Sequence, residues 1–211
     1  MKVNGTTAGY TTNSGKKPMT LELDKSTKIE KIALYFKKIM ETLDLDLDDP
    51  SLMDTPERVA KMYVNEIFKG LDNANFPKIS FFENNYAYKE IIVIRNITLY
   101  SYCEHHFVPF FGKVNVGYLP NNKVLGLSKV NRIVQFLASK PQVQEKLTVE
   151  IGNTLMKLLE THDMAVSIEA HHLCVASRGV EDSNSATKTK FFSGRFKKNK
   201  YRSQFLASIL A

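Results

Sequence analysis

The side chains best suited to chemistry lie together at residues 101–107, which read Ser-Tyr-Cys-Glu-His-His-Phe. Cys103 and His106 are separated by two residues, a spacing that lets one tight turn present both side chains to a single Zn²⁺ ion. The only other cysteine in the sequence is Cys174. Two cysteines and one histidine would provide three protein ligands and leave the fourth tetrahedral position for water, as in catalytic zinc sites. These residues therefore indicate a metal site suited to hydrolysis.

The histidines are clustered around the same two cysteines. Four of the five lie beside a cysteine, and only His162 lies elsewhere. The four are His105, His106, His171 and His172. Two other interpretations stay open on spacing alone, because buried free cysteines are common and inert and because a distant pair can form a disulfide.

Length, composition and charge indicate which classes of protein this sequence can belong to. The 211 residues are 43% hydrophobic and carry a formal net charge of +7. The sequence has no apolar run of about 18 residues, so we expect no membrane span. The first residues lack the apolar core of a signal peptide and there are only two cysteines, which predicts a cytoplasmic, reduced protein. The positive charge indicates an anionic partner, with nucleic acid, membrane surfaces and nucleoside triphosphates all open.

Three segments are expected along the chain. Residues 1–25 are rich in small and polar residues and are predicted to be a flexible arm. Residues 26–72 are predicted to form a pair of helices, the second beginning at Thr55-Pro56. Residues 73–211 are expected to form the catalytic domain, which ends in a basic tail predicted to be solvated.

The sequence pattern of the third segment is typical of an α+β domain. Strands are predicted at residues 79–82, 90–100 and 113–119. Two helices follow, one capped by Ser128 and one at residues 142–161. Residues 164–170 and 173–176 are predicted to be a strand pair or one bent strand. This order predicts an antiparallel sheet with two helices on one face, with Cys103 in a loop after a strand.

Four motifs in this order resemble the GTP cyclohydrolase I family. They are Ser-Tyr-Cys-Glu-His-His-Phe at 101–107, Gly-Leu-Ser-Lys-Val-Asn-Arg at 126–132, Pro-Gln-Val-Gln-Glu at 141–145 and His-Leu-Cys at 172–174. The similarity extends from about Thr55 to Leu206. It implies the tunnelling fold and a zinc-dependent enzyme whose metal-bound water opens the guanine imidazole ring of GTP at C8. Rearrangement and reclosure would then give 7,8-dihydroneopterin triphosphate and formate, the first step of tetrahydrofolate and pterin biosynthesis.

The resemblance also assigns roles to individual residues. The implied Zn²⁺ ligands are Cys103, His106 and Cys174. The implied acid and base are His105 and His172, a task that suits imidazole because its pKa lies near neutrality. The implied guanine contacts are Gln144 and Glu145, and the implied triphosphate contacts are Ser128, Lys129, Arg132 and Arg178. A carboxylate can accept from both N1–H and the exocyclic amine of guanine, and arginine can bind phosphate through two hydrogen bonds.

The implied partners are GTP and further copies of the chain, with two rings of five subunits stacked as a decamer and sites at subunit boundaries. No nucleic-acid or membrane partner is expected. Two alternatives were weighed against this interpretation. A nitrile-reducing enzyme of deazaguanine synthesis would use a cysteine nucleophile, which needs no metal-binding partners. A basic zinc-stabilised nucleic-acid-binding domain would need a closed four-ligand site and basic residues interleaved with stacking aromatics.

Overall fold

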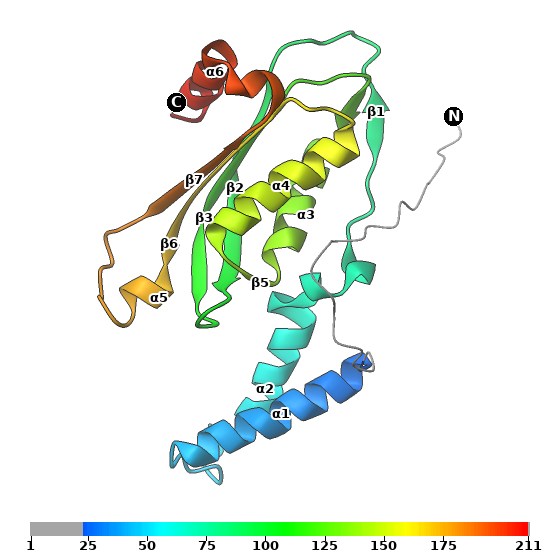
Figure 1. The fold of residues 1–211 in the computed structure, drawn as a ribbon. Helices are drawn as coiled ribbons and strands as arrows, with labels where there is room; N and C mark the ends of the chain where they lie inside the picture. Colours follow the sequence, from blue (N-terminus) through cyan, green and yellow to red (C-terminus); the bar gives the residue numbers. More distant parts are fainter. Residues whose placement is uncertain (1–22, 211) are drawn as a thin grey trace. The chain divides into compact units, whose positions relative to one another are not determined.

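The computed structural model describes residues 23–210, which form two compact units (Figure 1). The first unit extends to Val64 and the second begins at Asn65. The boundary expected from the sequence, after residue 72, therefore falls inside the second unit. The arm expected over residues 1–25 lies, up to residue 22, outside the described part of the chain.

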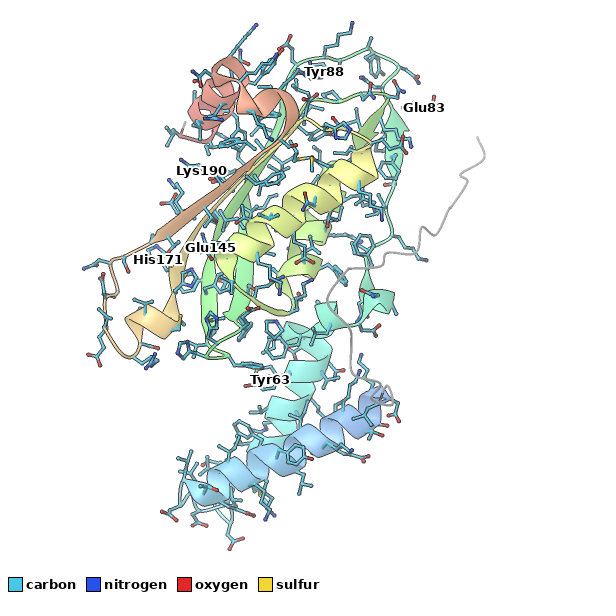
Figure 2. All side chains as sticks on the ribbon, viewed as in Figure 1. Tyr63, Glu83, Tyr88, Glu145, His171 and Lys190 are labelled. Atoms are coloured by element: carbon cyan, nitrogen blue, oxygen red, sulfur yellow. The ribbon has the colours of Figure 1, made fainter. Side chains whose placement is uncertain are left out.

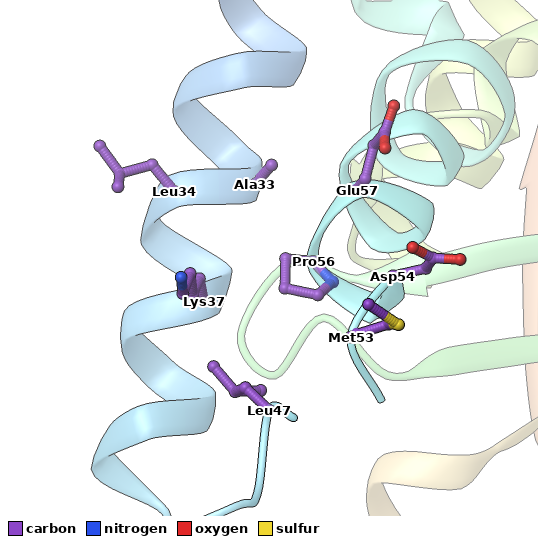
Figure 3. A pocket seen from close by; sticks show the side chains of 8 residues that line it. All are labelled: Ala33, Leu34, Lys37, Leu47, Met53, Asp54, Pro56 and Glu57. Carbon is purple, nitrogen blue, oxygen red and sulfur yellow. The ribbon is translucent and has the colours of Figure 1, made fainter. Parts of the chain in front are cut away.

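The first unit contains the expected pair of helices, α1 (Lys25–Thr42) and α2 (Thr55–Met62). Asp24 caps α1, because its carboxylate accepts hydrogen bonds from the backbone N–H and the hydroxyl of Thr27, both at 2.9 Å. Pro56 lies in the first turn of α2, where its missing N–H costs nothing. A pocket of about 270 Å³ lies between the two helices (Figure 3). It is lined by Ala33, Leu34, Lys37, Leu47, Met53, Asp54, Pro56 and Glu57, none of which is an expected site residue.

Short helical turns connect the units and lead into the second. They are the π-helical η1 (Tyr63–Ile67) and the 3₁₀ turns η2 (Lys69–Leu71) and η3 (Asn73–Asn75). No helix in the described part of the chain is long and apolar enough to cross a membrane.

The second unit is built on a five-stranded sheet with the order β5-β2-β3-β6-β7. The strands are β2 (Ile92–Cys103), β3 (Pro109–Tyr118), β5 (Pro141–Gln142), β6 (Met164–His172) and β7 (Thr187–Phe192). All neighbours are antiparallel except β5, which is parallel to β2. A separate small sheet pairs β1 (Phe81–Glu83) with β4 (Lys123–Leu125). The expected α+β class is confirmed, with a mixed rather than purely antiparallel sheet.

One face of the large sheet is covered by α3 (Leu127–Ala138) and α4 (Gln144–Leu159) (Figure 1). Side chains alternate along a strand, and Val114, Val116 and Tyr118 of β3 are fully buried in the core that includes both helices. The expected cap of α3 is wrong. Gly126 occupies the N-cap position without a side-chain hydrogen bond, and Ser128 lies exposed in the first turn.

One prediction for the last part of the chain is also wrong. Residues 173–176 form the short helix α5 (Leu173–Ala176) rather than a strand, and the last strand is β7. A run of four residues is too short for its apolar pattern to distinguish the two states. The basic tail contains η4 (Gly194–Lys197) and α6 (Asn199–Leu210), and most of its lysine and arginine side chains are exposed, as predicted. Phe196 and Phe205 are fully buried there, and they anchor the segment despite its many lysines.

Close packing of α4 on β7 depends on Gly152. A Cβ atom added at this position would overlap the ring of Phe191. Alanine normally stabilises a helix interior by about 0.5–1 kcal/mol relative to glycine, whereas overpacking costs about 1–3 kcal/mol. We therefore expect Gly152→Ala to lower the free energy of unfolding by about 1–2 kcal/mol, as measured by urea denaturation. Asn153→Ala, at the exposed neighbouring position, controls for helix propensity. An unchanged or raised stability in Gly152→Ala would show that Phe191 moves aside freely.

Candidate active site

A tight turn at the end of β2 contains Cys103, His105 and His106. The backbone N–H of Phe107 donates to the carbonyl of Cys103 at 2.8 Å, and the N–H of Cys103 donates to the carbonyl of Val108 at 2.9 Å. Phe107 has a φ of 56°, in the left-handed region that closes such a turn. Cys103 is buried at the strand end, and His105 and His106 are exposed on the turn.

The remote cysteine comes to the same place. β6 pairs with β3, which pairs with β2, so the chain after β6 returns beside the Cys103 turn. The helix α5 then presents Cys174. The ligand atoms of Cys103, His106 and Cys174 all lie within 4.8 Å of one another. The cysteine residues are free thiols, so the disulfide interpretation is not supported.

The donor set fits a metal ion. The Sγ atom of Cys103 lies 3.8 Å from Nδ1 of His106. Sulfur and nitrogen ligands around a tetrahedral Zn²⁺ would be about 3.6 Å apart, given bonds of about 2.3 and 2.0–2.1 Å. Burial, together with the neighbouring Cys103, raises the pKa of the Cys174 thiol. A cation would reverse that effect, because a metal stabilises the thiolate. Cys103, His106 and Cys174 could therefore hold a metal ion.

His105 lies beside this group but outside it. Its Nδ1 atom is also 3.8 Å from the Sγ atom of Cys103, and its ring meets that of His106 edge-on at 6.4 Å. It is not among the residues whose ligand atoms converge. Its exposed position leaves its ring available to a substrate.

His172 lies at the end of β6 in a more enclosed environment. Its ring stacks on Phe110 of β3, with centroids 4.7 Å apart and planes 11° apart. Its Nε2 atom is 2.7 Å from Oε1 of Gln144. Burial lowers the pKa of His172, and the nearby Glu145 carboxylate partly opposes that shift. The environment favours the neutral imidazole, which can accept a proton.

The two expected guanine contacts have different environments. Gln144 is 2% exposed, and its amide nitrogen lies within hydrogen-bond distance of Ile168 O, Thr187 O and Thr189 Oγ1. Glu145 is exposed at the N-terminal end of α4, where Figure 2 labels it, with His171 labelled near the end of β6. Of this pair, Glu145 has the side chain that is free to meet a base.

The expected triphosphate contacts are not all gathered at the metal group. Arg178 is close, with its Nη1 atom 3.3 Å from Nε2 of His106. The other three lie in the first two turns of α3 and are Ser128, Lys129 and Arg132. The opposite end of α3 faces β2, where the Ser101 hydroxyl donates to the carbonyl of Ala138 at 2.8 Å. Ten residues of helix separate Ser128 from Ala138, which corresponds to about 15 Å.

Sequence reasoning missed Phe110 and Thr189. Phe110 is directly opposite His172 in the β3–β6 register, and Thr189 lies on a strand that the sequence analysis did not predict. A correct pairing of the strands would have found Phe110, because register sets which side chains stack.

Comparison with known proteins places this site in a family. The model of the family described as GTP cyclohydrolase I matches residues 32–210. The chain belongs to the GTP cyclohydrolase I family. A protein named GTP cyclohydrolase 1 from Enterobacter sp. (strain 638) is 53% identical over 194 residues, covering 92% of this chain and 87% of that protein. A protein of the same name from Salmonella arizonae is 52% identical with the same coverage.

Membership of the GTP cyclohydrolase I family confirms the resemblance seen in the four motifs and makes the chain an enzyme. The matched residues 32–210 contain every expected site residue, from Cys103 to Arg178. Among solved structures, the apo archaeosine synthase QueF-Like matches at a TM-score of 0.41 and 13% identity, covering 49% of this chain and 93% of that one. A match at that level supports no conclusion about this chain.

Proposed function

We propose that this enzyme hydrolyses GTP to 7,8-dihydroneopterin triphosphate and formate, the first step towards tetrahydrofolate and other pterins. The convergence of Cys103, His106 and Cys174 in a chain of this family carries the proposal. These three residues would hold Zn²⁺, which supplies Lewis acidity and a water of lowered pKa. A cysteine nucleophile would not need the second cysteine and the histidine beside it, so the arrangement favours the hydrolytic alternative.

Two histidines would move the protons. The reaction takes up one water net and releases formate. A proton must leave the attacking water, and separate protons must reach the purine nitrogen N7 and the ribose oxygen. Burial lowers the pKa of His172, which suits this side chain to accept a proton, and the exposed His105 is suited to donate one. Glu145 would read guanine by accepting from N1–H and the exocyclic amine, a donor pair that adenine lacks.

The decisive experiment offers GTP to the purified, zinc-loaded protein and measures formate together with the fluorescent pterin. We expect both products from GTP, none from ATP, and none after the metal is removed by a chelator. Zinc-loaded protein that makes no formate from GTP would overturn the substrate assignment and leave the metal site standing.

We further propose that the complete site forms between copies of the chain, as in a decamer of two pentamers, within the tunnelling fold. Along α3, Arg132 is about 9 Å and Ser128 about 15 Å from the end that meets β2, with Lys129 between them, so a second copy would bring them to the metal group. The exposed sheet face offers a surface for assembly, because Tyr100 is 68% and Phe111 37% exposed while their rings stack at 6.1 Å.

A shared site predicts complementation between two inactive variants. Cys174→Ala would disable the part of the site that holds the metal, and Arg132→Ala the part that binds the triphosphate. Each variant alone should therefore have little activity. Co-assembly at equal amounts should restore about one quarter of wild-type activity, since each half is intact with a probability of one half. Light scattering gives the size of the mixed assembly. An active wild-type monomer, or mixed oligomers that regain no activity, would contradict the shared site.

A further inference from the structure

We propose that Gln144 is a positioning residue that fixes the tautomer of His172, so that Nε2 carries a hydrogen and Nδ1 is the atom that exchanges a proton with substrate. This inference rests on the proposed function only in giving His172 a substrate. It differs from the guanine-reading role that the resemblance implies for Gln144.

The first step concerns the orientation of the Gln144 amide. Its nitrogen faces the carbonyl oxygens of Thr187, at 3.0 Å, and Ile168, at 3.3 Å. Carbonyl oxygens can only accept hydrogen bonds. Rotating the amide by 180° would place its own oxygen 3.0 and 3.3 Å from two other acceptors, with no hydrogen between them. The amide nitrogen must therefore face Thr187 and Ile168, and Oε1 must face His172.

The threonine hydroxyls fit the same assignment. Thr148 donates its hydrogen to the backbone carbonyl of Gln144 at 2.7 Å. Its oxygen lies 2.7 Å from that of Thr189, so Thr189 must donate to Thr148. The Thr189 oxygen is then an acceptor for the Gln144 amide at 3.0 Å. Each hydroxyl hydrogen therefore has one acceptor, and the two amide hydrogens of Gln144 are shared among three acceptors. Gln144 and Thr148 are only 2% and 1% exposed.

The last step concerns the ring nitrogens of His172, whose protonation follows from the orientation of the Gln144 amide. Oε1 of Gln144 carries no hydrogen, so at 2.7 Å from Nε2 it can only accept. Nε2 must therefore be protonated, whether the ring is neutral or charged. The hydrogen bond made by one ring nitrogen determines the state of the other, so a neutral His172 has its lone pair on Nδ1. Stacking on Phe110 keeps the ring in the plane that this hydrogen bond requires.

The tautomer can be measured directly on the wild-type protein. Imidazole nitrogen chemical shifts separate protonated from unprotonated ring nitrogens, and solid-state NMR of ¹⁵N-histidine-labelled protein does not depend on the size of the assembly. With five histidines in the chain, the resonances lost in His172→Asn identify His172. At a pH about 1.5 units above the ordinary histidine pKa of about 6.5, we expect a protonated Nε2 and an unprotonated Nδ1. The reverse pattern overturns the inference.

The kinetic test uses Gln144→Leu, which keeps the side-chain size but removes the acceptor. We expect a mixture of His172 tautomers and a fall in kcat of roughly 10²-fold, the lower part of the range for acid–base groups. KM for GTP should change by less than about threefold, because the lost interaction acts in the chemical step. A rise in KM with unchanged kcat and unchanged nitrogen shifts would make Gln144 a guanine contact and overturn the positioning role.

Gln142→Leu is the matched control. Gln142 is also fully buried, and its amide nitrogen donates to Leu137 O at 3.0 Å and Glu150 Oε2 at 2.9 Å. This variant should lose stability as Gln144→Leu does, while keeping the His172 tautomer and the kcat of the folded enzyme. A changed tautomer in Gln142→Leu would show that general loosening, not Gln144, sets the ring state. If Gln144→Leu does not fold, the wild-type spectrum still decides. If the His172 nitrogen shifts are as expected but the enzyme makes no formate, the proposed function is refuted and the inference about the tautomer stands.

Discussion

Cys174→Ala is expected to lose both bound metal and turnover. The residue supplies one of three converging ligand atoms, and its helix α5 has no other cysteine to replace it. Even the loss of outer-shell partners of a metal ligand typically costs 10–100-fold in affinity, so loss of a ligand should exceed roughly 10²-fold. Metal content of the purified protein and formate release from GTP measure the two effects, and formate should fall to the background of the assay.

His162→Ala is the control for this experiment, because His162 is exposed and lies outside the group of Cys103, His106 and Cys174. It should retain one metal ion per chain. Full metal content in Cys174→Ala would show that Cys174 is a thiol that only packs against its neighbours and is not a metal ligand. Metal loss in both variants would indicate nonspecific binding to surface groups.

The group that could hold a metal ion could be predicted because its information is largely local. Cys103 and His106 are three positions apart, and a single turn determines their geometry. Cys174 could be added because no other cysteine exists in the sequence, although its element was predicted as a strand and is a helix. The ligand set therefore did not depend on the correct secondary structure around its third member.

The environment of Gln144 could not be predicted in the same way. Its orientation is set by Thr187 and Thr189, which follow it by 43 and 45 positions. These residues lie on β7, in a lysine-rich segment that the sequence analysis did not predict to be a strand. Non-local pairing of this kind leaves little local pattern, and the edge strand has mostly exposed side chains. The guanine contact implied for Gln144 came from the family resemblance, which does not include this enclosure of the side chain.

The triphosphate contacts show a different limit. Ser128, Lys129 and Arg132 share a motif with helical spacing, which places them on α3 but gives no information on what faces them. The contact of Ala138 with Ser101 fixes the other end of α3 near the metal group. The length of the helix therefore places these residues about 9–15 Å from that end, and in the proposed shared site a second copy would supply them. A prediction for one chain cannot contain that part of the geometry.

His105→Ala is expected to keep the metal and lose turnover by roughly 10²–10⁴-fold, the contribution of a positioned acid or base. Distance to Cys103 does not distinguish the two neighbouring histidines, since Nδ1 of each lies 3.8 Å from its Sγ atom. The difference comes from Cys174, whose sulfur converges with His106 but not with His105.

His106→Ala is the matched control for His105→Ala, because the two exposed rings differ by one position on the same turn. It should lose metal together with turnover, whereas His105→Ala should contain metal at the wild-type ratio and still bind GTP. Metal content and formate release, measured on both variants, show which histidine is a metal ligand and which is the proton donor. If His105→Ala lost the metal and His106→Ala kept it, the turn would present the other histidine to the ion, and the proton donor would have to be sought at His106.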